Sequence, residues 1–169
     1  MKRKLLMVTM TAMLTLMMTA LVNDPTSADS RDRSFGYYGW GPRIGLSVDP
    51  GQFVIGGHVD MGEPIAHLRL QPNVELGFGD NVTIIEINAP LHFRFADPID
   101  VWSPYAGAEL GYSIAFLDGG KDNADLGVKI VGGFERHLSD GDKFFVEGKI
   151  GLSDEVANWK FLVGWTFVD

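Results

Sequence analysis

The stretch that decides the fold is NWKFLVGWTF, residues 158–167, close to the C-terminal end of the chain. Its odd-numbered positions from 159 onward are all bulky and apolar: Trp159, Phe161, Val163, Trp165 and Phe167. The positions between them are small or polar, apart from one leucine. Because successive side chains of a β-strand point to opposite faces, this alternation predicts a strand with one strongly apolar face. The stretch alone leaves open whether that face meets a protein core or lipid.

Seven earlier stretches of about ten residues repeat the alternation and are separated by turn residues, chiefly Asp, Gly, Pro and Asn. No stretch holds a helical period over that length. With the last stretch they predict eight strands: Trp40–Asp49, Gln52–Met61, Ala66–Phe78, Val82–Phe95, Pro104–Leu117, Ala124–Leu138, Lys143–Leu152 and Asn158–Val168. Short turns join antiparallel neighbours, and an even number of strands can close without leaving an edge. The predicted fold class is therefore all-β, an eight-stranded antiparallel up-and-down barrel.

The two faces of these strands differ sharply in chemistry. One face carries Ile, Leu, Val and Phe, and the other carries charged residues, histidines and many glycines. Charges of both signs share the polar face, so they can pair when they are confined together. The predicted charge network comprises Arg43, Arg69, Arg94, Lys129, Lys149, Lys160, Glu75, Glu86, Glu109, Glu135 and Glu147.

Two kinds of barrel fit this alternation. A secreted or periplasmic lipocalin-like barrel would turn its apolar face inward and bind a hydrophobic ligand, whereas a membrane barrel would turn it outward. The charged face cannot meet lipid, because one basic residue at the bilayer midplane costs about 2–4 kcal/mol. Glycines on the charged face favour the membrane barrel, since a narrow lumen needs small residues opposite long charged ones.

Aromatic residues also favour the membrane barrel, because they gather near both ends of the predicted strands. Two belts of rings around an aliphatic band are typical of the two interfaces of a bilayer. With the first strand running outward from the periplasm, one belt contains Trp40, Phe93, Phe95, Trp165 and Phe167. The other belt contains Phe53, Phe78, Phe116 and Trp159.

The N-terminal segment has the features of an export signal. Three basic residues at positions 2–4 precede an uncharged apolar run, and small residues follow at 26–28. The sequence therefore predicts a cleaved signal peptide at 1–28, a polar lead-in at 29–39 and a β-barrel domain at 40–169. The chain has no cysteine, so it cannot form disulfides. Its formal net charge is −8, and this negative charge argues against nucleic acid as a partner, because phosphate binding needs a basic surface.

The signal, the eight alternating segments, the short turns and a last strand ending in WTF resemble the small outer-membrane β-barrel family, the OmpA/OmpX-like class. The resemblance implies a bacterial outer-membrane location, a structural or envelope role, a polar lumen filled by side chains, and at most narrow porin-like conductance. It also implies outer-membrane lipid or lipopolysaccharide and the barrel assembly machinery as partners. In that family the last strand usually ends on an aromatic residue that is recognised during assembly. Phe167, which Val168 and Asp169 follow, is either this assembly signal or only a residue of the aromatic belt. It leaves the oligomeric state undetermined.

The sequence gives weaker signals for metal binding and for catalysis. The four histidines share the polar face but lack the close spacing of a clustered metal site. A third hypothesis is a lipid-modifying outer-membrane enzyme that uses Ser47 or Ser113 with His58, but no nucleophile motif of the GxSxG kind is present. The sequence thus predicts no catalytic, cofactor-binding or metal-binding residues.

Overall fold

The structure is a computed structural model that describes residues 35–80, 82–95, 99–117, 123–152 and 159–168. The predicted signal peptide and residues 29–34 of the lead-in lie outside these ranges. The described chain is all β, and it contains no helix long and apolar enough to cross a membrane. Its strands are β1 Phe35–Val48, β2 Gln52–Gly62, β3 Leu68–Leu70, β4 Asn73–Phe78, β5 Val82–Arg94, β6 Trp102–Leu117, β7 Asn123–His137, β8 Lys143–Gly151 and β9 Trp159–Val168.

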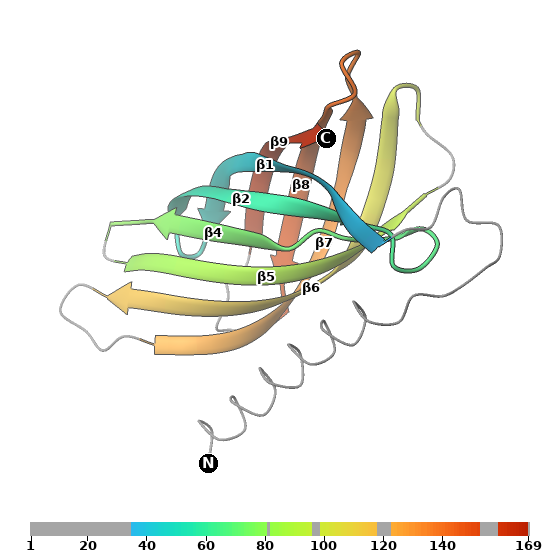
Figure 1. Cartoon of the computed structure of the whole chain (residues 1–169). Helices are drawn as coiled ribbons and strands as arrows, with labels where there is room; N and C mark the ends of the chain where they lie inside the picture. The colour runs from blue at the N-terminus through green and yellow to red at the C-terminus, as the bar shows by residue number, and fades with distance from the viewer. Residues whose placement is uncertain (1–34, 81, 96–98, 118–122, 153–158, 169) are drawn as a thin grey trace. The chain divides into compact units, whose positions relative to one another are not determined.

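The strands form one closed antiparallel barrel (Figure 1). Apart from the short strand β3, strands that follow one another along the chain pair with one another, and β9 pairs with β1 to close the circle. The short strands β3 and β4 both pair with β5, and together they occupy the position of the third of the eight predicted strands. The described residues therefore form the predicted eight-stranded up-and-down barrel.

A proline explains why the third strand is split. The sequence predicts one strand over Ala66–Phe78, but the structure has β3 and β4 with a break at Gln71 and Pro72. Proline has no backbone N–H and cannot donate to the ladder. Its carbonyl still accepts a hydrogen bond from the N–H of Val59 at 2.9 Å, which keeps the broken strand beside β2.

The first strand is longer than expected. The prediction assigned residues 29–39 to the lead-in, but β1 begins at Phe35, so its first five residues belong to the barrel. The pairing with β2 shifts register between Phe35 and Gly39, which marks a bulge or irregularity. This irregularity hides the alternation that identified the rest of the strand.

The orientation of the two faces is plain in every long strand. In β9 the side chains alternate between exposed and buried, from exposed Trp159 and buried Lys160 to buried Thr166. Apolar residues such as Ile44 and Ile87 are 46% and 57% exposed on the outside, whereas Arg43 and Lys129 are fully buried inside. The hypothesis of an apolar-lined carrier is therefore wrong, because the charged face encloses the lumen.

The lumen also contains apolar side chains. Val54, Tyr105, Val131, Phe145 and Leu162 are all buried on the inward parity. The Phe145 ring lies over the space beside Gly164 in the neighbouring strand β9, where residues Phe145 and Gly164 are directly paired. A Cβ at Gly164 would overlap this ring and would lie 2.8 Å from the carbonyl oxygen of Pro42. Glycine at this position lets an aromatic ring fill the lumen.

We expect Gly164→Ala to destabilise the folded barrel by about 1–3 kcal/mol, the usual cost of overpacking a tight interior. Gly148→Ala is the matched control, because Gly148 faces outward and the nearest atom to an added Cβ is 3.9 Å away. Its effect should stay within about 1 kcal/mol. Urea titrations of the folded fraction would measure both variants, and equal midpoints for the two would contradict the packing described here.

Candidate functional site

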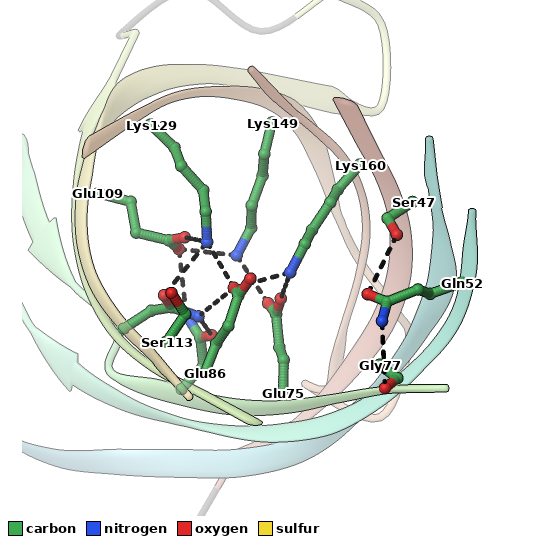
Figure 2. Close-up of polar contacts among 12 residues, drawn as sticks. Ser47, Gln52, Glu75, Gly77, Glu86, Glu109, Ser113, Lys129, Lys149 and Lys160 are labelled. Carbon is green, nitrogen blue, oxygen red and sulfur yellow. Dashed lines mark hydrogen bonds and ion pairs between the residues drawn. The ribbon is translucent and has the colours of Figure 1, made fainter. Parts of the chain in front are cut away.

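The centre of the lumen holds a layer of lysines and glutamates that meet across the barrel (Figure 2). All six side chains are buried. The lysines come from β7, β8 and β9, and the glutamates come from β4, β5 and β6: Lys129, Lys149, Lys160, Glu75, Glu86 and Glu109. We call this set the central ionic layer. One wall of the barrel is therefore basic at this level, and the opposite wall is acidic.

The contacts within the central ionic layer are short and shared. Lys149 Nζ lies 2.7 Å from both Glu75 Oε1 and Glu109 Oε2. Lys160 Nζ lies 2.7 Å from Glu86 Oε2 and 3.0 Å from Glu75 Oε2. Each of these ammonium groups thus bridges two carboxylates, and each of Glu75, Glu86 and Glu109 contacts two lysines. Such sharing satisfies several donors and acceptors at once, which buried charges require.

Strand register explains the arrangement of the walls. Glu75 is directly opposite Glu86 on neighbouring strands, and Lys149 is directly opposite Lys160. Like charges in directly opposite cross-strand positions repel one another. Within the layer this repulsion is offset by the direct pair of Glu109 with Lys129 on the neighbouring strands β6 and β7, and by contacts across the lumen, which join strands distant in the sheet. The central ionic layer therefore depends on the closed barrel.

A second group lies beside the central ionic layer and is built around Arg43 of β1. Its Nη1 contacts Glu75 Oε1 at 3.2 Å and Glu147 Oε1 at 3.3 Å. The hydroxyl of Tyr105 donates a hydrogen bond of 2.9 Å to the other oxygen of Glu147. The guanidinium carbon also lies 5.2 Å from the centroid of the Phe145 ring, within the range of a cation–π contact.

A third group lies nearer the end of the barrel where β1 begins. Arg69 Nη1 hydrogen-bonds to Glu135 Oε2 and lies 3.8 Å from Asp60 Oδ2. Lys143 Nζ contacts the same Asp60 oxygen at 3.0 Å. The charge network predicted from the sequence contains neither Asp60 nor Lys143. The signal for Lys143 was weak because it is the first residue of its strand.

Arg94 does not join these groups. It is the last residue of β5, its side chain is 33% exposed, and its Nη1 contacts Glu63 Oε1 at 2.7 Å. Glu63 follows β2 in the connection to β3. Arg94, which the sequence assigned to the lumen network, thus forms its ion pair with Glu63 and not with an acid of these three groups. Parity correctly points Arg94 inward, but its position at the strand end places it at the mouth of the barrel.

Several buried polar atoms of the second and third groups, and of Gln71, His58 and His92, have no hydrogen-bond partner among the described residues. They are Nε and Nη2 of Arg43, Nε of Arg69, Nε2 of Gln71, Nδ1 of His58, both ring nitrogens of His92, and Oε1 of Glu135. Buried polar groups are nearly always hydrogen-bonded, to protein or to water. This half of the lumen therefore has spare hydrogen-bonding capacity, unlike the central ionic layer.

The residues considered for catalysis or metal binding lie apart. Ser47 donates to the carbonyl oxygen of Pro50 at 2.7 Å, and Ser113 donates to that of Asp125 at 3.4 Å. The Nε2 of His58 contacts Thr166 Oγ1 at 2.8 Å. The described contacts thus pair neither serine with this histidine. The described residues also contain no group of three or more His, Cys, Asp or Glu side chains that could hold a metal ion.

The aromatic residues of both predicted belts are exposed on the outside of the barrel. At the end where β1 begins, Trp40 is paired with Phe167 and their ring centroids are 5.6 Å apart. Phe93 and Phe95 are in ring contact at 5.4 Å. At the other end, Phe53 is directly opposite Phe78. Leu46 lies between Phe53 and Phe161 in the sheet, and Thr83 lies between Phe78 and Phe116. Exposed rings are thus present near both rims.

Comparison by sequence finds no match to this chain, whereas comparison by structure does. No protein-family model matches it, and no curated protein matches it in sequence. Solved structures do match it in fold. Neisserial surface protein A has a TM-score of 0.59 at 16% identity, with 77% of this chain and 94% of that chain covered.

Two further structures give the same result. The N-terminal β-barrel domain of Pseudomonas aeruginosa OprF has a TM-score of 0.53 at 15% identity, with 80% of this chain and all of that chain covered. The Yersinia pestis outer membrane protein Ail has a TM-score of 0.50 at 9% identity, with 78% of this chain and 99% of that chain covered. The chain therefore has the fold of the small eight-stranded outer-membrane β-barrels, the OmpA/OmpX-like class.

Proposed function

We propose that this protein is an integral barrel of the bacterial outer membrane with a structural role in the envelope. The observation that carries the proposal is the orientation of the closed sheet, which buries the charges and exposes the aliphatic and aromatic residues. An exposed face of this kind is favourable in lipid and costly in water. The fold likeness to an outer membrane protein, Ail, supports the same location.

We further propose that the lumen is closed at the central ionic layer. Lysines and glutamates from opposite walls meet there at distances of 2.5–3.2 Å between charged atoms. An eight-stranded barrel is only wide enough for side chains to fill its interior. The unpartnered polar atoms of the second and third groups offer binding positions for water on one side of this layer. The resulting path supports at most narrow, porin-like conductance.

A non-catalytic role fits the contacts better than lipid modification does. The two serines and His58 point into the lumen and are engaged with other groups, whereas a nucleophile for lipid should reach the membrane. The partners in this proposal are outer-membrane lipid or lipopolysaccharide around the barrel and the assembly machinery during insertion. In it, Phe167 serves as the aromatic assembly signal, and nucleic acid is not a partner.

Replacement of Val163 tests the lipid-facing assignment. Val163 is outward in the middle of β9, where it is paired with Ile44 and Val146. We expect Val163→Arg to cost about 2–4 kcal/mol in a bilayer and to prevent stable insertion. Val163→Leu is the control and should insert normally. Membrane fractionation and the mobility shift of unheated gel samples would measure both, and equal membrane yields would contradict the proposal.

A double-mutant cycle tests the central ionic layer. We expect Lys149→Met to destabilise the barrel by about 3–5 kcal/mol, because it leaves an uncompensated buried negative charge. In the double variant with Glu109→Gln the layer is again balanced: Lys129 keeps Glu86, and Glu75 keeps Lys160. The double variant should therefore be more stable than Lys149→Met alone in urea titrations of the refolded barrel. If the stability losses of the two single variants simply add up in the double variant, Lys149 and Glu109 do not interact.

Conductance across planar bilayers tests the closure of the lumen. We expect the native barrel to pass little or no ionic current. The Glu109→Ala and Lys149→Ala double variant removes volume from the layer while preserving its charge balance, and it should conduct several times more. Gly148→Ala, on the outer face, is the control and should behave like the native barrel. A native current as large as that of the double variant would mean that the layer does not close the path.

A further inference from the structure

Arg136 is an exception on the outer face of the barrel. It lies on the outward parity of β7, one residue before the strand ends, and its side chain is exposed. The other outward positions of the described strands carry aliphatic, aromatic, small or hydroxyl side chains. Within the described strands, Arg136 is thus the one charged residue that points out of the barrel.

Aromatic rings surround this arginine. In the sheet, Arg136 is directly opposite Trp102 of β6 on one side and Phe144 of β8 on the other. The centroids of the Trp102 and Phe144 rings are 6.1 Å apart, and the centroids of Phe144 and Trp165 are 4.6 Å apart. Together these four residues form what we call the Arg136 cluster. It lies toward the end of the barrel where β1 begins and β9 ends.

No acidic side chain of the described chain neutralises Arg136, which forms no ion pair there. Its neighbour Glu135 points inward and is bonded to Arg69. The acids of the following turn are engaged with backbone groups: Asp140 accepts from the N–H of Asp142, and Asp142 accepts from the N–H of Val168. A guanidinium with five donors is therefore available at the outer surface.

The surroundings identify the chemistry of a partner. Aromatic rings mark the headgroup level of a bilayer, where the cost of an outward arginine falls to nearly nothing. The anions at that level are lipid phosphates, and the planar fork of arginine binds phosphate oxygens in a bidentate geometry. A cation among rings at this level is thus matched by a phosphate from the membrane itself.

We propose that the Arg136 cluster binds the headgroup phosphate of an anionic glycerophospholipid in the leaflet that surrounds this end of the barrel. The guanidinium contacts the phosphate, and Trp102, Phe144 and Trp165 line the adjoining part of the lipid. This inference rests on the proposed function, because it requires the barrel to lie in a bilayer.

Quenching of tryptophan fluorescence by brominated lipid tests the site. The full chain is refolded with Trp40→Phe and Trp159→Phe, so that Trp102 and Trp165 report on the cluster. The vesicles are phosphatidylcholine with increasing brominated phosphatidylglycerol, or with brominated phosphatidylcholine as the reference. We expect phosphatidylglycerol to be preferred by about fivefold, the ratio typical of one basic side chain near anionic lipid. Arg136→Gln should remove the preference, and Arg136→Lys should retain part of it.

Arg94→Gln is the matched control, because Arg94 lies at the same end of the barrel but is paired with Glu63. It should keep the full preference. Excess inorganic phosphate should leave the preference unchanged, whereas its loss would indicate a free-anion site and overturn the lipid assignment. Equal quenching by both lipids, or a preference that survives Arg136→Gln, would overturn the inference alone. A chain that fails to insert into vesicles would overturn the proposed function together with it.

Discussion

The structure depends on neutralising a face of the sheet that cannot meet lipid. Arginine, lysine and glutamate side chains recur on the inward parity of nearly every strand, and an isolated buried charge is costly in any apolar surrounding. Closure of the barrel brings these charges together from opposite walls, so that Lys149 and Lys160 find partners across the lumen. The outward face can then be uniformly apolar, because the polar residues are gathered inside.

The lumen is not uniform along its length. The central ionic layer has dense, shared contacts, whereas the groups around Arg43 and Arg69 keep polar atoms without a protein partner. Aromatic rings, Phe145 and Tyr105, fill the space in the less dense half. Dense contacts at one level and spare hydrogen-bonding capacity at another fit the structural role proposed for this barrel.

The alternation of side chains was enough to predict the strand number, the antiparallel order and the lumen residues, because period two is a local property of a strand. The alternation did not predict features that depend on a proline, on an irregular pairing or on the position of a residue along its strand. Pro72 broke the third strand, and an irregularity in β1 concealed residues 35–39. Parity placed Arg94 inward but could not show that it lies at the mouth. Pairing across the lumen, such as Lys149 with Glu75, depends on closure and stagger, which no single strand contains. Arg136 lies outside the predicted network because that network contained only residues of the polar, inward parity, whereas Arg136 is on the outward parity of β7.

The like-charged neighbours within each wall have a consequence for how the barrel forms. A partly zipped sheet that contains β4 and β5 holds Glu75 beside Glu86, and one that contains β8 and β9 holds Lys149 beside Lys160. Within the central ionic layer, opposite charges are directly paired between neighbouring strands only where the two walls meet, at Glu109 of β6 and Lys129 of β7. Growth of the sheet therefore accumulates electrostatic strain, much of which the contacts between Glu75 and the lysines of β8 and β9 relieve once the barrel has closed. A register error between the halves would leave part of that strain in place, so the charges act as a check on correct assembly as well as a filling for the lumen.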